Sequence, residues 1–461
     1  MTRINSRHPW AIVGGGFLGM TLALRLAQQG KVVTLFEAAP YLGGVASAWR
    51  LGDVVWDRHY HVTLHSDTHL RSLLAELRLE DELQWKRART GFFAESRLHS
   101  MSSAMEFLRF PPLNLIEKAR LGVTILRASR IQDSSELEKI PVQRWLETWS
   151  GKAVTRKLWL PLLRAKLGDG YRETSAAFIS NTIARMYSAR RTSTKAEMFG
   201  YVPGGYARIL KSFEELLTRS GVSIRLGQPV RAVRRTCTGE LRVEVGRECS
   251  EDFSRVVVAT AAPLTAELCP SLLHEERERL RGIKYQGLIC ASLLLKEPLS
   301  PFYITNIADT SVPFTAVIEM SALVDRKEFG GRSLVYLPKY LSPSSSYLGQ
   351  SFAQIREDFV KALEHMHPAF SRANIDCFQI SRVKYLLPVP TINFSASIPP
   401  FFTSVPGLYV VNSAQIVDGT LNVNETVRLA ESAAQRLDDL TPVSDYPIPA
   451  LFRHEFAASH S

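Results

Sequence analysis

Long apolar runs are missing from this sequence. Apolar residues make up 45% of the 461 positions, yet no stretch approaches the roughly 18 to 20 unbroken apolar residues that a membrane-spanning helix needs. Residues 1–9 carry charge but no apolar core of a secretory signal. We therefore expect a soluble, cytoplasmic protein, and the chain length predicts two or three domains.

Cysteine is also scarce. None of the cysteines forms a CxxC pair or lies beside a group of histidines; they are Cys237, Cys249, Cys269, Cys290 and Cys377. This pattern argues against a disulfide framework and against a zinc site, and it is typical of reduced thiols in a reducing compartment. We expect no bound metal.

Several signatures of enzymes and of nucleic-acid-binding proteins are absent. There is no nucleophile elbow with a Ser-His-Asp order, no HExxH and no P-loop. The net charge of +11 is spread along the chain, with one short cluster at Arg190-Arg191 and no accompanying helix-turn-helix, RRM or zinc pattern. We expect no nucleic-acid partner. The positive charge suits a bound diphosphate and a peripheral contact with an anionic membrane surface.

A glycine turn between a strand and a helix is the main feature that is present. Residues 10–13 are a short apolar run typical of a buried parallel strand, and residues 17–29 have the apolar spacing of a helix that ends before Gly30. Residues 31–36 are a second, β-branched run that closes on Glu37. Together these segments form one βαβ unit of the usual length, about 30 residues.

The turn at residues 14–19 suits a dinucleotide. Gly14 permits the tight turn, Gly16 lets the backbone approach a diphosphate, and Gly19 lets the helix pack close to the strand. The N-terminus of the helix offers amide groups and the positive end of its dipole to the phosphates. Glu37 can accept hydrogen bonds from a ribose diol.

A second glycine pair, Gly43-Gly44, follows within residues 41–47. A nicotinamide dehydrogenase normally enters its next βα unit here, whereas this pair brings further backbone amides to the diphosphate. At this point the sequence resembles the flavoprotein family that includes amine oxidases, protoporphyrinogen oxidase and phytoene desaturases, whose ribose-binding Glu is followed by a GG segment, usually GGR. Val45 stands where that Arg is expected, and Arg50 is the next basic residue along the chain.

The resemblance returns in three later segments. Residues 201–206 resemble the stretch that re-enters the FAD-binding domain, and Val230 matches the position whose backbone faces the adenine. Residues 255–260 resemble the family's strand that ends in Ala-Thr. Residues 407–413 resemble the closing GLYLAGD segment, with Asn412 at the position of the acidic residue near the ribityl chain.

The closing helix is expected from about residue 424 to residue 437, with Asn424 as its N-cap residue. The resemblance implies that this N-terminus points at the flavin, where it can stabilise negative charge on the reduced cofactor. Because no Cys lies in residues 407–437, we expect FAD to be bound non-covalently. The residues expected to bind FAD are Gly14, Gly16, Phe17, Leu18, Gly19, Glu37, Gly43, Gly44, Val45, Val230, Asn412 and Asn424.

The resemblance implies an α/β fold with a Rossmann-like FAD-binding domain of the glutathione-reductase type and a discontinuous α+β substrate-binding domain. We expect residues 1–90, 200–283 and 401–440 to form the FAD-binding domain. Residues 91–199 and 284–400 are expected to form the substrate-binding domain, and residues 441–461 a C-terminal tail.

Candidates for contact with the substrate lie in both domains. His59 and His61 belong to a stretch that passes near the flavin ring in proteins of this type, so either can act as a base or a substrate ligand. Arg164 and Lys166 lie in an apolar setting and can bind an acidic or phosphorylated group. Tyr385 precedes the return to the FAD-binding domain and can line the pocket near the flavin. Core packing or surface solvation is the alternative for each of these residues.

A fourth group of candidates lies on expected strands of the substrate-binding domain: Glu319, Tyr336, Lys339 and Tyr340. Alternation along a strand can direct some of them into a cleft between the domains. We take Tyr336 as the substrate-contacting member.

Three functions remain open. The first is an FAD-dependent oxidoreductase that removes a hydride from a C–H or C–N bond of a hydrophobic or ring-bearing small molecule and passes electrons to oxygen or another oxidant. The second is a redox-neutral flavoenzyme that resembles UDP-galactopyranose mutase and acts on a nucleotide sugar. The third is a flavin-binding protein with a structural or assembly role and no turnover. The oligomeric state is left open.

Overall fold

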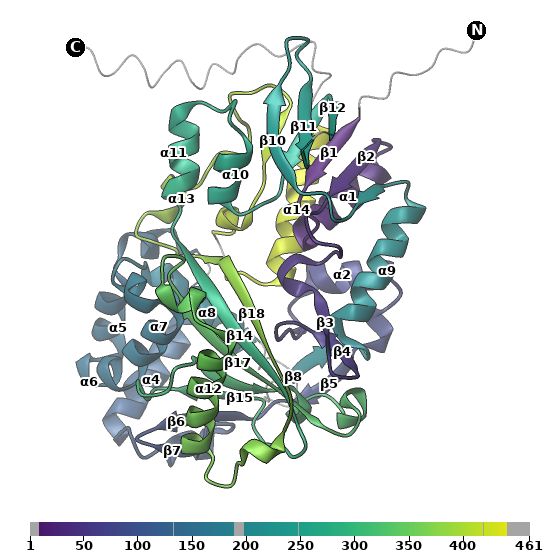
Figure 1. Cartoon of the computed structure of the whole chain (residues 1–461). Coiled ribbons are helices and arrows are strands. Elements are labelled where there is room, and N and C mark those ends of the chain that lie inside the picture. Colours follow the sequence, from purple (N-terminus) through teal and green to yellow (C-terminus); the bar gives the residue numbers. More distant parts are fainter. Residues whose placement is uncertain (1–8, 132, 189–197, 248, 418, 440–461) are drawn as a thin grey trace, which may run out of the picture.

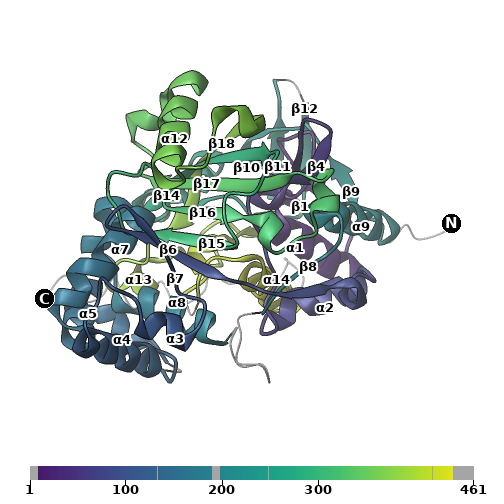
Figure 2. The same cartoon turned by 90° about the horizontal axis from the view of Figure 1, so that it is seen from below.

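The computed structural model describes five stretches of the chain, residues 9–131, 133–188, 198–247, 249–417 and 419–439. The expected C-terminal tail, residues 441–461, and the basic pair Arg190-Arg191 lie outside the described residues. Figures 1 and 2 show a small parallel sheet at one end of the molecule, and a larger sheet with a helical layer at the other end.

A five-stranded parallel sheet forms the centre of the first part. Its order is β19 (Leu408–Val410), β13 (Arg255–Val258), β1 (Trp10–Val13), β2 (Val33–Phe36) and β9 (Ser223–Arg225). Both β1 and β13 are buried along their whole length, as near-continuous apolar runs predict for parallel strands that are covered on both faces. The chain leaves β1 through α1 toward β2, whereas β13 pairs on the other side of β1, and the turn after β1 opens at the carboxyl edge of the sheet.

The two faces of this sheet are covered differently. Trp10 and Ile12 face the core formed with α1 (Phe17–Gln28), α2 (Thr68–Glu76), α9 (Gly205–Arg219) and α14 (Val423–Asp438). Ala11 and Val13 face a second core, formed with the three-stranded antiparallel sheet of β10 (Val230–Arg235), β11 (Leu241–Val245) and β12 (Cys249–Phe253) and with α10 (Ala262–Leu268) and α11 (His274–Gly282). This architecture confirms the expected α/β, Rossmann-like fold.

A seven-stranded sheet forms the second part. Its order is β18 (Ile375–Pro388), β14 (Tyr285–Leu295), β17 (Ser333–Leu341), β16 (Ala316–Glu319), β15 (Ile304–Ile307), β6 (Thr90–Ala94) and β7 (Arg97–Ser100). All its neighbours are antiparallel except β15 and β6. Alternate residues of β14 and β17 face α12 (Phe352–Met366) on one side. The others face the hairpin of β3 (Ala48–Leu51) and β4 (Val54–Asp57).

A layer of helices lies beside this sheet, and Figure 1 shows it at the lower left. It contains α3 (Ala104–Leu108), α4 (Leu115–Ala128), α5 (Val142–Ser150), α6 (Lys152–Val154), α7 (Leu160–Leu167) and α8 (Ala176–Ser188). The strands β5 (Gln84–Arg87) and β8 (Met198–Tyr201) pair where the chain leaves and re-enters the first part, and α13 (Phe394–Ser397) precedes the final return. The strand membership of the two large sheets supports the proposed domain division, which we keep as a proposal.

Candidate cofactor and substrate site

The turn after β1 is held in a conformation that glycine adopts most readily. Gly14 has a φ of +116°, and its amide donates to the Phe36 carbonyl at 2.8 Å. A Cβ on Gly19 would lie 1.8 Å from the Gly14 carbonyl oxygen, so α1 can approach the turn this closely only without a side chain there. Gly16 precedes α1 without a side-chain cap, and the first turn of the helix has no acidic residue. The first amides of α1 therefore suit phosphate oxygens.

Phe17 and Leu18 contribute backbone rather than side chains to this turn. Both side chains are buried in the core under the parallel sheet. The ring of Phe17 packs edge-to-face against Tyr206 and Phe213, with centroid distances of 5.6 and 5.9 Å. A ligand at the turn would therefore meet the amide groups of these two residues.

The carboxylate of Glu37 stabilises the turn from the side of β2. One oxygen accepts a hydrogen bond from the Gly15 amide at 2.7 Å, and the other accepts one from the Ala39 amide at 2.8 Å. Each oxygen keeps a second lone pair for a ribose hydroxyl. The Gln228 amide donates to the Glu37 carbonyl at 3.0 Å, which brings the start of β10 at Val230 to the same end of the site.

The second glycine pair packs directly against the first turn. The Gly43 amide donates to the Gly15 carbonyl at 2.8 Å, and Gly43 forms a parallel bridge with Gly16. Gly44 has a φ of +56° and begins η1 (Gly44–Ala46); a Cβ on it would lie 3.2 Å from the Gly16 Cα. Side chains at these positions would fill the space beside the turn, so the glycines keep two stretches of backbone open to a diphosphate.

The Arg58 guanidinium supplies a positive charge beside the second glycine pair, where Val45 has none. Val45 is 41% exposed and carries no charge. The Arg58 guanidinium stands 5.0 Å from the ring centroid of Tyr41 and 5.2 Å from that of Trp49, and it donates to the Tyr41 hydroxyl at 2.7 Å. Its Nε is buried without a hydrogen-bond partner in the described part of the chain. Arg50, the next basic residue along the chain after Val45, lies exposed on β3.

The loop after β19 contains a buried amide that lacks a partner. Asn412 is 1% exposed, and its Oδ1 accepts a hydrogen bond from the Ala414 amide at 3.0 Å. Its Nδ2 is buried and has no hydrogen-bond partner among the described residues. Since an unsatisfied buried donor is costly, this amide fits a ligand that supplies an acceptor oxygen.

The expected N-cap of the closing helix is wrong by two residues. The cap of α14 is Asn422, whose side chain accepts from the Glu425 amide at 3.0 Å. Asn424 lies inside the first turn, where its Oδ1 accepts from the Leu70 amide at 3.1 Å and its Nδ2 donates to Glu425. Both asparagines are good capping residues, and only the packing of α2 against this helix decides between them.

Taken together, these residues fit FAD. The Glu37 carboxylate and the adjoining start of β10 suit a ribose and an adenine, and the glycine backbone suits the diphosphate. The unpaired Asn412 amide suits a hydroxyl further along the cofactor. The donors and acceptors therefore follow the order in which the cofactor presents its groups.

His59 has a hydrogen-bond partner within the protein at each of its ring nitrogens. His59 is buried, with Nδ1 2.7 Å from the Val45 carbonyl oxygen and Nε2 3.0 Å from the Ser381 hydroxyl. Burial lowers its pKa to about 4, and burial with the neighbouring His59 lowers the pKa of His61 to about 3. Both rings are neutral near pH 7. The geometry therefore favours a positioning role for His59, which ties the second glycine segment to β18.

Tyr336 was expected to contact the substrate, and this expectation is wrong. Its side chain is 0% exposed, and its hydroxyl donates to the Asp57 carbonyl at 2.5 Å. Glu319 is likewise enclosed: it accepts hydrogen bonds from the Leu299 and Ser300 amides and from the Ser333 hydroxyl. Both residues lie on the covered side of their strands, which alternation alone cannot distinguish from the cleft side.

Arg164 and Lys166, which were expected to act together, have different surroundings in the structure. Arg164 is exposed and lies beside Tyr171, with 3.4 Å between its Nη2 and the tyrosine hydroxyl. The Lys166 ammonium donates to the Tyr340 hydroxyl at 2.8 Å, and that hydroxyl lies 3.0 Å from the Tyr60 hydroxyl. This array links α7, β17 and the stretch after β4. Tyr60 was overlooked in the sequence, although its neighbours His59 and His61 marked the stretch.

A cavity of about 780 Å³ lies between α10 and the end of α11 on one side and the start of β14, the end of β18 and residues 168–173 on the other. Its lining includes Tyr285, Gln286, Tyr385 and Val389 together with loop residues 342–345. Tyr385 packs edge-to-face on Tyr285, with 5.7 Å between the ring centroids. The predicted pocket residue Tyr385 therefore lines a cavity, whereas Tyr285 and Gln286 were missed because a buried strand shows no functional signature.

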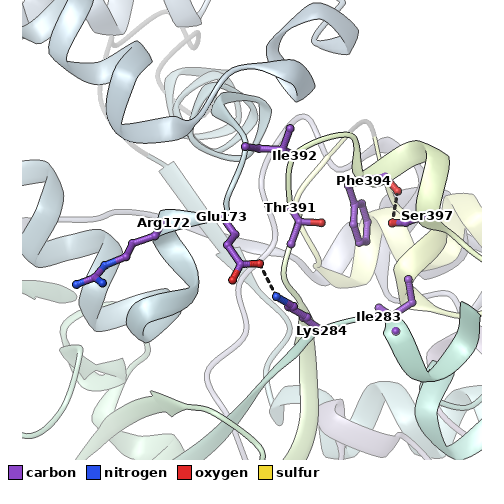
Figure 3. Close-up of a pocket in the computed structure, with 9 residues that line it drawn as sticks. Arg172, Glu173, Ile283, Lys284, Thr391, Ile392, Phe394 and Ser397 are labelled. Atoms are coloured by element: carbon purple, nitrogen blue, oxygen red, sulfur yellow. Dashed lines mark hydrogen bonds and ion pairs between the residues drawn. The ribbon is translucent and has the colours of Figure 1, made fainter. Parts of the chain in front are cut away.

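A second cavity of about 400 Å³ adjoins the first, and Figure 3 shows its lining. The two cavities share Glu173 and Lys284, whose side chains form an ion pair at their common wall. Thr391 and Ile392 line the same space from the segment that leads to α13. Neither lining includes the glycine turn.

The described ranges lack both a metal-binding cluster and a membrane-spanning helix. They contain no group of three His, Cys, Asp or Glu side chains placed to hold a metal ion. The five cysteines are free. None of the described helices has both the length and the apolarity required to cross a bilayer.

Comparison with known proteins identifies relatives over most of the chain. Residues 19–437 match the family model of flavin-containing amine oxidoreductases. A 15-cis-phytoene desaturase of Synechococcus elongatus is 25% identical over 48% of this chain and 50% of its own length. The chain spans about half to 64% of the length of such curated relatives.

Solved structures agree with this fold. A protein of Exiguobacterium sp. assigned as a protoporphyrinogen oxidase is 19% identical with a TM-score of 0.75, covering 94% of this chain and 99% of its own. Reduced UDP-galactopyranose mutase is 12% identical with a TM-score of 0.72, covering 95% and 97%. At such identities the likeness concerns the fold alone. With the family match over residues 19–437, the chain belongs to the family of flavin-containing amine oxidoreductases.

Proposed function

We propose that this protein removes a hydride from a C–H or C–N bond of a hydrophobic or ring-bearing small molecule and passes the electrons to oxygen or another oxidant. The observation that carries the proposal is the position of Tyr285, which lines the 780 Å³ cavity and also contacts the closing loop of the FAD-binding region. Tyr285 forms part of the cavity wall, and its hydroxyl accepts from the Ala262 amide at 3.2 Å and hydrogen-bonds the Ser413 side chain. Ser413 follows Asn412 directly, so Tyr285 connects the cavity to the loop that contains Asn412.

The cavity lining supports a substrate with an apolar body and a polar end. The rings of Tyr285 and Tyr385 and the side chains of Ile283 and Val389 form apolar surface. Gln286 is 5% exposed; its Nε2 donates to the Leu167 carbonyl at 2.5 Å, and its Oε1 is buried without a partner in the described residues. That oxygen suits an amine or hydroxyl donor of the substrate.

FAD, when bound non-covalently, supplies the hydride acceptor. The chain's own residues hold and orient it. Glu37 and the backbone of Val230 would bind the adenosine part, the two glycine segments the diphosphate, and Asn412 the polyol chain. Arg58 would supply the positive charge that Val45 lacks, because its guanidinium lies beside the second glycine segment. His59 would hold that segment against β18.

The test is to mix the purified holoenzyme anaerobically with a panel of amines and of ring-bearing C–H donors. Reduction of the flavin is monitored by its visible absorbance. We expect one class of donor to bleach the flavin and oxygen to restore it. Gln286→Leu should lower kcat/KM for that donor about tenfold, because one hydrogen bond to a buried acceptor is lost. Leu273→Ser, at an exposed position outside the cavity, should leave it unchanged.

The two other functions give different results in this experiment. A redox-neutral mutase would convert a nucleotide sugar only after prior flavin reduction and without net consumption of electrons. A flavin-binding protein without turnover would resist reduction by every donor. Either result would contradict the proposed oxidation. Location in the cytoplasm and use of oxygen as the oxidant belong to the same proposal.

A further inference from the structure

The helix α4 presents its apolar side to solvent. Leu115 and Ile116 are each 74% exposed, Val123 is 54% exposed and Leu126 is 42% exposed. These residues lie on one side of the helix, since they recur at helical spacing. The opposite side packs against α5 and α8. An amphipathic surface helix normally has the reverse arrangement.

Polar groups occupy the covered side of the same helix. Glu117 and Lys118 are both 8% exposed. The Glu117 carboxylate accepts a hydrogen bond from the Lys157 ammonium at 2.9 Å, and the Lys118 ammonium donates to the Leu108 carbonyl at 2.7 Å. The charged groups are therefore satisfied inside the protein, and the exposure of the apolar side follows from how the helix is packed.

The apolar surface continues onto α3, where Met105 is 57% exposed and Leu108 is 51% exposed. Figure 2 shows α4 at the outer edge of the helical layer, with α3 beside it. We call this surface the α3–α4 face, and it consists of Met105, Leu108, Leu115, Ile116, Val123 and Leu126. Scattered exposed apolar residues are ordinary, but a contiguous group of this kind indicates an interaction surface.

The unpaired charges of residues 105–131 have one sign. Arg109, Arg120, Arg127 and Arg130 are exposed, and none forms an ion pair within the described part of the chain. Residues 105–131 contain two acidic residues. Glu117 is paired as described, and Glu106 accepts from the Ser100 hydroxyl and the Ser102 amide. No acidic group in this segment is left free to balance the arginines.

We propose that the α3–α4 face docks onto the surface of a lipid bilayer that contains anionic lipids. The exposed leucine, isoleucine, valine and methionine side chains would enter the boundary between headgroups and acyl chains. The arginines at the edge would meet the lipid phosphates with their apolar stems along the surface. This inference concerns binding and does not depend on the substrate proposed above.

Charge distinguishes this partner from a second copy of the chain. In a symmetric dimer the same patch meets itself, so the four arginines of one copy would face those of the other, and residues 105–131 offer no free acidic group to pair with them. Such like-charge pairs are unfavourable. An anionic bilayer supplies the opposite charge to the same residues and an apolar layer to the same helix.

The test uses the full-length holoenzyme and two kinds of vesicle, phosphatidylcholine alone and phosphatidylcholine mixed in equal parts with phosphatidylglycerol. We expect co-flotation with the mixed vesicles and weak binding to the neutral ones. The double variant Leu115→Ser, Ile116→Ser should lower the partition coefficient at least about tenfold, because two exposed apolar side chains are lost from the bilayer contact. Arg120→Gln with Arg127→Gln should lower binding to the mixed vesicles alone, about fivefold for each charge.

Leu264→Ser with Leu273→Ser provides the matched control, since both leucines are exposed outside the α3–α4 face. This variant should bind vesicles like the unaltered protein. FAD content and the thermal unfolding midpoint check that every variant is folded. Absence of vesicle binding, or binding that the α3–α4 variants leave unchanged, overturns the proposal. A concentration-dependent dimer that the Leu115→Ser, Ile116→Ser variant abolishes, without vesicle binding, would identify a second copy as the partner instead.

Discussion

The Glu37 carboxylate accepts a hydrogen bond from the Gly15 amide at 2.7 Å, across 22 residues of sequence. This contact joins the end of β2 to the glycine turn after β1. Because the other carboxylate oxygen accepts from the Ala39 amide, one side chain holds both segments that flank the cofactor site.

Replacement of Glu37 should therefore weaken FAD binding. In Glu37→Gln one acceptor oxygen becomes an NH2 group facing an amide donor, so a hydrogen bond is lost together with one acceptor for ribose. We expect an FAD dissociation constant at least about tenfold higher, measured by flavin fluorescence on adding FAD to apoprotein. Glu76→Gln, which alters a surface contact to Arg25 in the same region, is the control and should bind FAD normally. Equal affinities of Glu37→Gln and Glu76→Gln would contradict this role.

Gly19→Ala should disrupt the approach of α1 to the turn. The added Cβ would lie 1.8 Å from the Gly14 carbonyl oxygen, which is backbone and cannot rotate aside. We expect a loss of about 1–3 kcal/mol or more in the free energy of unfolding, and loss of bound FAD. Gly282→Ala meets no heavy atom within 4 Å and should change neither property. Thermal unfolding and the flavin content of the purified variants measure both effects.

Arg58→Ala tests which cation serves the diphosphate. We expect FAD affinity to fall about five- to tenfold in Arg58→Ala, to recover partly in Arg58→Lys, and to stay unchanged in Arg50→Ala. The salt dependence of the dissociation constant should be smaller in Arg58→Ala than in the unaltered protein, because a charge–charge contact has been removed. A larger effect from Arg50 than from Arg58 would reverse the assignment.

Stability should fall in mild acid because of His59. Burial lowers its pKa to about 4, below the ordinary value near 6.5. Between these two values the unfolded chain binds more protons than the folded one, so the free energy of unfolding decreases as the pH falls from about 6.5 to about 4. The full effect is of order 3 kcal/mol for this buried group, and the lowered pKa of His61 adds to it.

Denaturant titrations across that pH range measure the slope. His59→Gln should reduce the slope of the free energy of unfolding against pH. His274→Gln, which alters an exposed histidine, should leave this slope unchanged. An unchanged slope in His59→Gln would show that another group is responsible.

Local features of the chain predict well the parts of the site that depend on local geometry. The glycine turn, the helix that follows it and the strand that ends at Glu37 lie where the sequence predicts them, because positive φ angles and apolar periodicity act over a few residues. The closing helix is also close to its expected range, and its cap is misplaced by two residues. The misplacement has a simple cause, since Asn422 and Asn424 both cap well in isolation.

Residues whose role depends on a distant partner are less predictable. Alternation along the strand of Tyr336 shows that its side chains point to two faces, but not which face is covered. The hairpin of β3 and β4 covers the face on which Tyr336 lies. Arg58 and Arg50 are both basic residues near the second glycine pair in sequence. The pairing of β3 with β4 brings Arg58 back to Tyr41 and Trp49 and leaves Arg50 exposed.

By itself, the sequence determined the cofactor class and the α/β fold, because the glycine turn, the acidic strand end and the second glycine pair are short-range patterns with one good structural solution. Only the tertiary structure decided the surroundings of that cofactor. It placed Tyr285 between the cavity and the closing loop, enclosed Tyr336, and turned the apolar side of α4 outward. Burial depends on what packs over each face, and that is set by segments hundreds of residues apart.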